Sequence, residues 1–411
     1  MIIRNGHVVD PSQSLDRILD IRIENGRIAE LGEHLKLSTD ERAIDASGAY
    51  VAPGFIDMHV HLRDPGNPEK ETLATGTAAA VAGGFTAVAA MPNTNPPLDT
   101  PDLVRYVAHA EPSGEIACRV YPIACITAGR KGELPAEYAD LALAGAVAFS
   151  DDGSTVMNAR VLYEAALAAK EIAGAFIVHC EDVHLKGSAF RNSHANALAE
   201  DTIVARDLEI AQASGKAWHI AHLSTANALA SVRESRSRGV RVTCEVAPHH
   251  LVFTDEAIDR LGSRAKVNPP LRSQQDVDAL RAGVLDGTID VFATDHAPHT
   301  EGEKTADVSC GAVGFTGLEV AVGAYAFALP SLAAGRFVEL LSTNPARILG
   351  VPGGTLAVGS PADVTIFADR PWKVEPSKLR SKGKSTPFAG MTLPRRVLAT
   401  IVGGVPAYEY A

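Results

Sequence analysis

The sequence lacks any apolar run approaching the roughly 18–20 residues that a membrane helix needs. Its start, MIIRNGHVVD, also lacks the basic and apolar segments of a signal peptide. Cysteine is scarce: five widely spaced residues, an odd number, with no Cys-x-x-Cys pair. This usage favours a reducing compartment over a disulfide framework. We therefore expect a cytoplasmic protein that does not bind membranes.

Positive charge is also in short supply. Lys and Arg number 38 against 49 Asp and Glu, so the formal net charge is -11. A protein that grips nucleic acid through a basic face shows the opposite balance, and we expect no nucleic-acid partner. The 46% hydrophobic content is enough to offset the entropy of ordering the chain, which excludes disorder. What the chain does have is histidine, 14 residues that cluster in short apolar segments.

The middle of the chain alternates short apolar segments with stretches that are apolar at helical spacing, such as VLYEAALAAKEIA and TIVARDLEIAQASG. Eight such β-then-helix units over about 250 residues predict an α/β fold, a (β/α)8 TIM-type barrel. A doubly wound sheet is the structural alternative, but it more often uses five or six strands. The predicted strands are 55–61, 85–91, 118–124, 145–149, 175–179, 217–222, 240–246 and 290–295.

Both ends of the chain have a different texture, with short strands and turns. Asn25-Gly26 is a predicted hairpin turn, and strand-like segments return after Pro352. We infer a small β-sandwich-like domain formed by both chain termini. The predicted domains are 1–52 and 351–411 for the two parts of the β domain, with the catalytic barrel, 53–350, inserted between them.

The first barrel segment, FIDMHVH, carries two histidines one residue apart. Side chains of a strand alternate between two faces, so two such imidazoles can converge on one ion. The polar set predicted to face the barrel or its mouth is Asp57, His59, His61 and Arg63. The apolar set predicted to meet the helices is Ile56, Met58, Val60 and Leu62. The alternative is a pair of buried histidines satisfied by hydrogen bonds, although burying so many polar groups is costly.

Other predicted strands end in the same residue types. His179 and His222 end two of them, Asp295 ends the last, and 145–149 runs into Asp151-Asp152. Active sites of this barrel lie at the C-terminal ends of the strands. Histidine and carboxylate ligands suit zinc, with Mn, Co or Fe as alternatives. The pattern therefore predicts an open catalytic metal site, where bound water has a pKa of about 7.

The ordered motifs resemble those of dihydroorotases in the amidohydrolase superfamily. GFIDMHVHLRDPG and FATDHAPHTEGEK are similar to the two signature segments of that family. MPNTNP, SDDG, HCED, AHLST, APHHL and KVNPPLR lie between them in the family's order. The resemblance runs from NGHVVDP near the start to STPFAG near the end. It implies reversible hydrolysis of L-dihydroorotate to N-carbamoyl-L-aspartate in pyrimidine biosynthesis.

When the family's functional residues are matched to this sequence by position, the resemblance implies one or two zinc ions. The implied ligands are His59, His61, His179, His222 and Asp295. Many relatives bridge two metals with a carboxylated lysine, but LAGAVAFSDDGSTV contains none. In this respect the chain resembles bacterial type I dihydroorotases, which use an aspartate. Spacing favours Asp152 as that ligand, with Asp151 as the alternative.

The resemblance also assigns roles toward the substrate. Asp295 is expected to orient the attacking hydroxide, take its proton and return it to the leaving ring nitrogen. Arg63 would grip the free carboxylate with a bidentate fork, and Asn93, Asn268 and His299 would share that task. Without the resemblance, both asparagines read as ordinary turn residues. A homo-oligomer and a complex with aspartate carbamoyltransferase are further implications.

Two alternative functions remain open. One is another cyclic-amide hydrolase, such as a hydantoinase or allantoinase, against which stand the missing lysine and Arg63. The other is a non-catalytic scaffold subunit of an aspartate carbamoyltransferase complex, against which stands the full ligand set.

Other polar residues receive lesser roles. His249 and His250 are expected to pack near the site. His219 is expected to lie away from the metal, because its strand parity differs from that of His222. The role of His296 is open. The polar, glycine-containing segment 299–315 is predicted to be either a mobile lid or a solvated loop.

Overall fold

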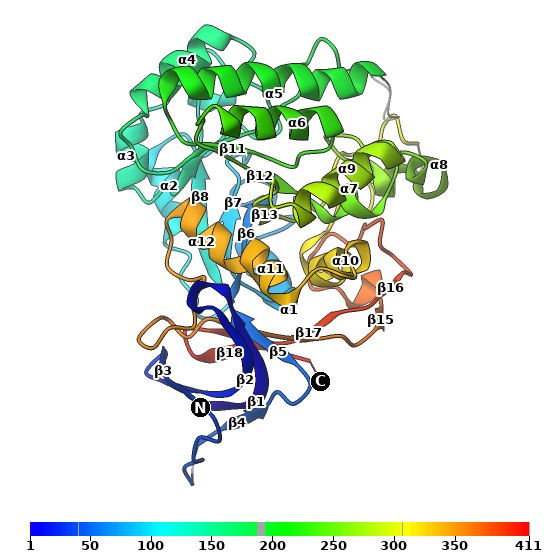
Figure 1. The fold of residues 1–411 in the computed structure, drawn as a ribbon. Coiled ribbons are helices and arrows are strands. Elements are labelled where there is room, and N and C mark those ends of the chain that lie inside the picture. The colour runs from blue at the N-terminus through cyan, green and yellow to red at the C-terminus, as the bar shows by residue number, and fades with distance from the viewer. Residues whose placement is uncertain (40, 187–193, 306, 411) are drawn as a thin grey trace.

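The fold consists of a barrel surrounded by helices and a β domain beneath it, with both termini in the β domain (Figure 1). The computed structural model describes residues 1–39, 41–186, 194–305 and 307–410. Helix α5 begins at His194, at the edge of the undescribed segment. Within the described ranges, no helix combines the length and hydropathy needed to cross a bilayer.

The barrel has eight parallel strands in chain order, so all eight predicted strands are confirmed. They are β6 (Phe55–Val60), β7 (Phe85–Ala90), β8 (Arg119–Ala124), β9 (Ala148–Phe149), β10 (Phe176–Val178), β11 (Trp218–Ile220), β12 (Val242–Val246) and β13 (Val291–Phe292). A parallel bridge between Val60 and His296 joins the last strand's end to the first. His61 N also donates to His296 O at 2.8 Å, so the ring of strands is nearly closed.

Helices follow the strands and cover the barrel (Figure 1). They are α1 (Leu73–Ala82), α2 (Pro101–Ala108), α3 (Tyr138–Leu143), α4 (Ala159–Ala168), α5 (His194–Ser214), α6 (Ala226–Ser237), α7 (Pro248–Val252), α8 (Ala257–Leu261), α9 (Gln274–Leu285), α10 (Ala321–Ala328), α11 (Ala334–Val338) and α12 (Asn344–Leu349). Capping residues determine where several of these helices begin. Thr72 and Ser273 form capping boxes at the N-termini of α1 and α9, and Thr225 caps α6.

A separate apolar cluster fills the barrel interior. It combines Ile56 and Met58 of β6 with small or branched residues of β7, β8, β9, β10 and β13, and with Leu349 of α12. Strands from opposite sides of a barrel share a cluster only through its interior, so α12 closes the barrel at its base. The alternation predicted for 55–63 is therefore wrong in part. Ile56 and Met58 face the barrel interior and not the helices. A register shift between Asp57 and Val60 breaks the alternation, so Val60 still packs with the helix layer, as predicted.

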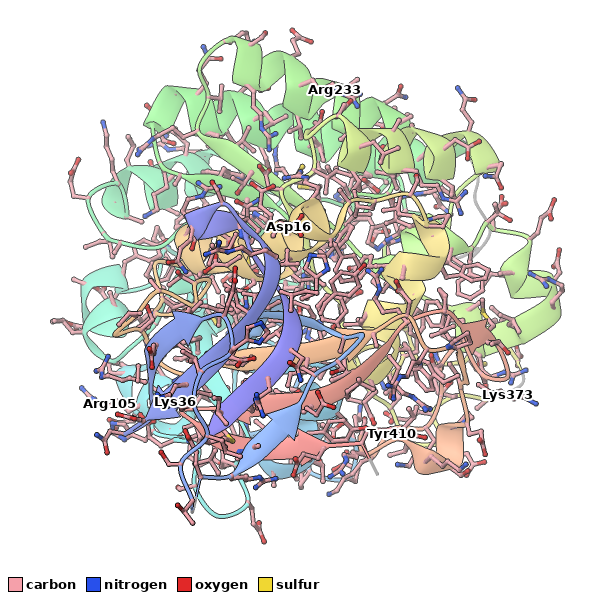
Figure 2. The ribbon with its side chains drawn as sticks, turned by 60° about the horizontal axis from the view of Figure 1, so that its bottom comes forward. Asp16, Lys36, Arg105, Arg233, Lys373 and Tyr410 are labelled. Atoms are coloured by element: carbon pink, nitrogen blue, oxygen red, sulfur yellow. The ribbon has the colours of Figure 1, made fainter. Side chains whose placement is uncertain are left out.

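The β domain is one sheet built from both chain ends, as predicted. Its order is β18-β17-β14-β5-β1-β2-β3, with β4 paired to β1. The strands are β1 (Ile2–Asp10), β2 (Leu15–Glu24), β3 (Arg27–Gly32), β4 (Ala43–Asp45), β5 (Tyr50–Pro53), β14 (Val364–Ala368), β17 (Arg396–Val402) and β18 (Val405–Glu409). A two-stranded ribbon, β15 (Trp372–Lys373) with β16 (Thr392–Leu393), lies beside it. Figure 2 turns this domain forward, with Asp16 of β2 and Tyr410 beyond β18 labelled.

The predicted hairpin turn between β2 and β3 is confirmed. Asn25 and Gly26 have φ values of 50° and 73°. Two positive φ angles in succession are the signature of a type I′ turn, which suits the twist of the strands that it joins.

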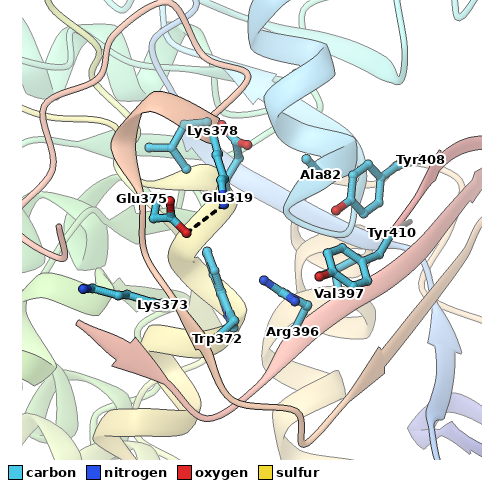
Figure 3. A pocket seen from close by; sticks show the side chains of 11 residues that line it. Ala82, Glu319, Trp372, Lys373, Glu375, Lys378, Arg396, Val397, Tyr408 and Tyr410 are labelled. Carbon is cyan, nitrogen blue, oxygen red and sulfur yellow. Dashed lines mark hydrogen bonds and ion pairs between the residues drawn. The ribbon is translucent and has the colours of Figure 1, made fainter. Parts of the chain in front are cut away.

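Aromatic side chains join the β domain to the barrel. Phe367 of β14 lies 5.6 Å from the ring of Phe55 in β6 and 5.9 Å from that of Phe337 in α11. A pocket of about 260 Å³ opens beside this junction, lined by Trp372, Arg396 and other residues (Figure 3). Glu375 and Lys378 form an ion pair of 2.8 Å in its wall.

Replacing Phe367 with alanine should lower the free energy of unfolding by about 3–5 kcal/mol. The removed ring would leave a cavity between the core of the β domain and the core of the barrel. Urea titration followed by circular dichroism measures the loss. The control is Phe327→Ala on α10, whose side chain is 46% exposed, and its effect should stay within about 0.5 kcal/mol. Equal losses in the two variants would contradict the importance of this junction.

Candidate metal centre

Six side chains that can bind a metal converge at the C-terminal ends of five barrel strands. All six are buried, with exposed fractions of 6% or less. They are His59 in β6, His61 just beyond β6, Asp152 after β9, His179 after β10, His222 after β11 and Asp295 after β13. The structure thus brings together every metal-binding residue that the sequence predicted.

Asp152 lies at the centre of this group. Its carboxylate oxygens are 3.4 Å from Nε2 of His59 and of His61. The same carboxylate is 3.5 Å from Nε2 of His222 and 3.7 Å from Nδ1 of His179. The ligand atoms form two sets, His59–His61–Asp152 and Asp152–His179–His222, each within 4.8 Å. Asp152 therefore belongs to both sets.

The outer nitrogens of two histidines are held by oxygen acceptors. Nδ1–H of His59 donates to Oε1 of Glu245 at 2.6 Å, and Nδ1–H of His61 donates to Oδ1 of Asn93 at 2.7 Å. In the neutral rings, each Nε2 then presents a lone pair to a carboxylate. Nε2 of His59 and Oδ1 of Asp152 are buried without any hydrogen-bond partner. Acceptors that face one another in this way fit a metal cation between them.

The other two histidines point to the same conclusion. Nδ1 of His179 lies 2.9 Å from Nε2 of His222. Two imidazole lone pairs at this distance repel, so a proton or a shared cation must lie at this point. The ring of His179 is also oriented by Glu181, whose Oε2 is 3.5 Å from Nε2.

The buried carboxylates of this site favour the binding of positive charge. Burial alone would lower the pKa of His59, but Asp152 and Glu245 raise it well above its ordinary value. Burial alone would raise the pKa of Asp152, but His59 and its neighbours hold it well below the usual range. Asp295 behaves likewise, because its close contact with His61 and the charges of the nearby imidazoles lower its pKa against the effect of burial. Both carboxylates are therefore ionised and able to bind a cation.

Of the two neighbouring aspartates, only Asp152 faces the histidines. Oδ1 of Asp151 instead accepts hydrogen bonds from the backbone N–H groups of Ile126 (2.9 Å) and Thr127 (3.1 Å). The Thr127 hydroxyl donates to its other oxygen. Asp151 thus connects the turn after β9 to the turn after β8, and this contact helps to orient Asp152 toward the histidines.

Three residues of this centre have a strained backbone. Arg63, His222 and Asp295 have φ values of 60°, 33° and 50°, in the left-handed region that residues with a Cβ rarely adopt. Such conformations cost about 1–3 kcal/mol each and persist where the surroundings enforce them.

A cavity of about 170 Å³ adjoins the metal-binding group. Arg63, Asn93 and Asn268 line it, as the sequence predicted. Nε of Arg63 donates to the backbone oxygen of Pro298 at 3.2 Å. In the orientation that satisfies both its polar atoms, the Asn268 amide accepts from Nζ of Lys186 at 2.7 Å. One guanidinium and two amides around a small cavity offer hydrogen-bond donors that suit an anion.

His299 lies behind this cavity rather than in its wall. Its Nε2–H donates to Val313 O at 2.8 Å, and the ring is 3.3 Å from Nη2 of Arg63. Burial and the Arg63 charge lower its pKa to about 4, so the ring is neutral at pH 7. Segment 299–315 borders the site through Val313 and Gly314. Its lid function stays a prediction, and position 306 lies outside the described residues.

Sequence reasoning missed Glu245 of β12. It accepts from Nδ1 of His59 with one oxygen, and its other oxygen lies 3.1 Å from Nε2 of His219. His219 is therefore no ligand, but it touches the site through Glu245. Burial would raise the pKa of Glu245, but the charge of His59 lowers it to about 2. The available signal was the single charged residue in the buried strand VTCEV, since charge is rarely buried without a partner.

The remaining histidines surround the centre. His249 and His250 are buried in α7, with their rings 4.3 Å apart, and His249 packs on Phe315 at 4.9 Å. His296, beside Asp295, accepts from Gly317 N at 3.1 Å. The packing role expected for the first two agrees with these contacts.

The chain belongs to the amidohydrolase family, whose model matches residues 50–406. Among curated proteins it is similar to the dihydroorotase of Citrifermentans bemidjiense, at 44% identity over 425 residues that cover 100% of this chain and 99% of the relative. It is 46% identical to the dihydroorotase of Pelotomaculum thermopropionicum over 420 residues, covering 98% and 97%. The expected resemblance is thus confirmed over the whole chain.

Solved structures agree on the fold. The L-hydantoinase (dihydropyrimidinase) of Arthrobacter aurescens superposes with a TM-score of 0.86 at 26% identity, covering 99% of this chain and 96% of that one. The dihydropyrimidinase of Brevibacillus agri gives 0.85 at 23% identity, covering 98% and 94%. These likenesses confirm the barrel with its added β domain.

Glu245→Gln should weaken metal binding by about 10- to 100-fold, because the charged acceptor that orients His59 is lost. Equilibrium dialysis against buffered zinc, with metal content measured on the protein, tests this. Glu234→Gln on α6, an exposed position, is the matched control. Unchanged affinity in the Glu245 variant would show that this carboxylate does not support the centre.

Proposed function

We propose that the protein is a metal-dependent dihydroorotase that interconverts L-dihydroorotate and N-carbamoyl-L-aspartate. The observation that carries the proposal is the convergence of four histidines and two aspartates beside a cavity lined by Arg63. Full-length identity of 44–46% to two dihydroorotases supports the same substrate. A cyclic amide is a poor electrophile, so its hydrolysis needs the strong polarisation that such a site supplies.

We propose zinc as the metal, because its ligand preference matches imidazole and carboxylate. Bound zinc would polarise the substrate carbonyl and lower the pKa of water. The proposed ligands are His59, His61, Asp152, His179, His222 and Asp295. Asp152 belongs to both ligand sets, so the same residues can hold one ion or two.

Asp295 is the proposed proton carrier. Its carboxylate is buried and 3.2 Å from Nε2 of His61, at the edge of the substrate cavity. Held ionised, it can accept a proton from the attacking water and then deliver it to the ring nitrogen that leaves.

Arg63 is the proposed partner of the substrate carboxylate. It is partly buried, lines the cavity and keeps two of its nitrogens near Pro298 and His299. A guanidinium fixed in this way loses little freedom when it binds a planar anion. Asn93 and Asn268 offer amide hydrogens from neighbouring walls, and His299 supports Arg63 from behind.

We further propose a homo-oligomer, an association with aspartate carbamoyltransferase and a cytoplasmic location. Support for the location comes from the five cysteines, all present as free thiols, which suits a reducing compartment.

The first experiment measures hydrolysis of L-dihydroorotate by zinc-loaded protein, before and after chelation, with metal content determined on the same sample. Chelator-sensitive turnover supports the proposal. Dihydropyrimidines, hydantoins and allantoin form the substrate panel. Faster turnover of any of these would favour another cyclic-amide hydrolase. Bound metal without turnover, even with aspartate carbamoyltransferase added, would favour a scaffold.

Asp295→Asn should lower kcat by about 10²- to 10⁴-fold, because the proton carrier is lost while the other ligands remain. Steady-state kinetics and metal analysis of the same sample separate the two effects. A variant that keeps its metal and most of its turnover would refute the assigned role.

Arg63→Ala should raise KM by about 10- to 100-fold, since a hydrogen-bonded charge pair contributes about 1.5–3 kcal/mol. The effect on kcat should be smaller. Arg105→Ala, on the exposed side of α2, is the control for removing one positive charge. An unchanged KM for Arg63→Ala would place the substrate carboxylate elsewhere.

A further inference from the structure

A second pocket lies at the opposite end of the barrel from the metal centre. It has a volume of about 680 Å³. Its walls come from the loops that enter β10, β11 and β12 and from α12, the helix that closes the barrel base. Five of its lining residues are cationic: Lys170, Lys216, Arg236, Arg241 and Arg347.

The described lining of this pocket contains no Asp or Glu. That is unexpected for a chain with a net charge of -11. A large concave surface with one sign of charge focuses its field on small ions of the opposite sign. The charge pattern alone therefore favours an anionic occupant.

Structural roles account for two of the five cations. Arg236 is paired with Asp290 and donates to the Thr288 carbonyl at 2.6 Å. Nζ of Lys216 donates to Ala169 O at 2.8 Å and Ile172 O at 2.6 Å, at the C-terminal end of α4. These two would be needed whether or not a ligand binds.

The other three have no acidic partner among the described residues. Lys170, Arg241 and Arg347 are exposed, and none forms an ion pair. Lys170 and Arg241 approach the same turn: Nη2 of Arg241 donates to Gly215 O, and Nζ of Lys170 lies 3.8 Å from where a Cβ on Gly215 would stand. These three like charges have no ion-pair partner of their own, and a bound anion would reduce the repulsion between them.

The charge of Lys216 responds to this crowding. Burial and the Arg241 charge together lower its pKa to about 8, whereas Glu171 opposes the shift. Glu171 is the acidic side chain that acts on Lys216, and it does not line the pocket.

We propose that this pocket binds a small polyanion carrying two or more phosphate groups, such as pyrophosphate or a nucleoside diphosphate. Arg241 and Arg347 would each offer a planar fork to a phosphate, with Lys170 as a point charge between neighbouring oxygens. The volume leaves room for a group larger than phosphate itself. The site is independent of the proposed hydrolytic function, because it shares no residue with the metal centre.

Isothermal titration of the zinc-loaded protein with pyrophosphate, and separately with ADP, tests the proposal. We expect saturable binding of one anion per chain, which weakens as salt is raised. The double variant Arg241→Gln/Arg347→Gln should bind at least about tenfold more weakly, as expected from losing two charged hydrogen-bond donors. Lys170→Gln, which changes one exposed side chain, tests the same wall if the double variant does not fold.

The control is Arg160→Gln at the N-terminal end of α4, the end of that helix away from Lys170. Its affinity for both anions should equal that of the parent. No saturable binding by the parent would overturn the proposal. Equal binding by the parent and the pocket variants would also overturn it, because the anion would then lie elsewhere, for instance at the metal centre. Dihydroorotate hydrolysis is measured separately, so either proposal can fail without the other.

Discussion

The mutual repulsion of buried acceptors at one end of the barrel is the constraint on which the site depends. Four imidazoles and two carboxylates lie within contact distance of one another, and the hydrogens of two rings are committed to Glu245 and Asn93. Without a metal ion or bound protons, imidazole lone pairs would face ionised oxygens in a buried region. The fold brings these groups together, and a metal ion would stabilise the arrangement.

The barrel supplies the rigidity that this arrangement needs. Small residues such as Ala87, Ala89 and Ala148 fill its interior, and α12 closes its base. The proposed ligands lie at the strand ends, where backbone hydrogen bonds limit their movement. The left-handed backbone at His222 and Asp295 adds a local cost, and the packed barrel around them has to bear it.

Much of this could be predicted from the sequence, because periodicity and strand-end chemistry are local. The eight strands, the ligand-bearing strand ends and the β domain from both termini all followed from patterns within a few residues. The faces of β6 did not, since the irregularity between Asp57 and Val60 arises from pairing with β7. The choice between Asp151 and Asp152 depended on a contact with Thr127, about 24 residues away in sequence. The part played by Glu245 depended on packing between strands far apart in the chain.

Glu245 also shows why buried charge in a barrel is seldom an isolated feature. Its carboxylate forms hydrogen bonds with His59 and with His219. Nδ1 of His219 in turn lies 2.7 Å from the hydroxyl of Thr243. Thr243 lines the cationic pocket at the barrel base. One chain of hydrogen bonds therefore runs through the barrel wall from the metal centre to that pocket. Each polar group in this series of hydrogen bonds is satisfied by the next one. The carboxylate near the metal centre and the cations at the barrel base are therefore separated by paired groups, with no unpaired ion between them.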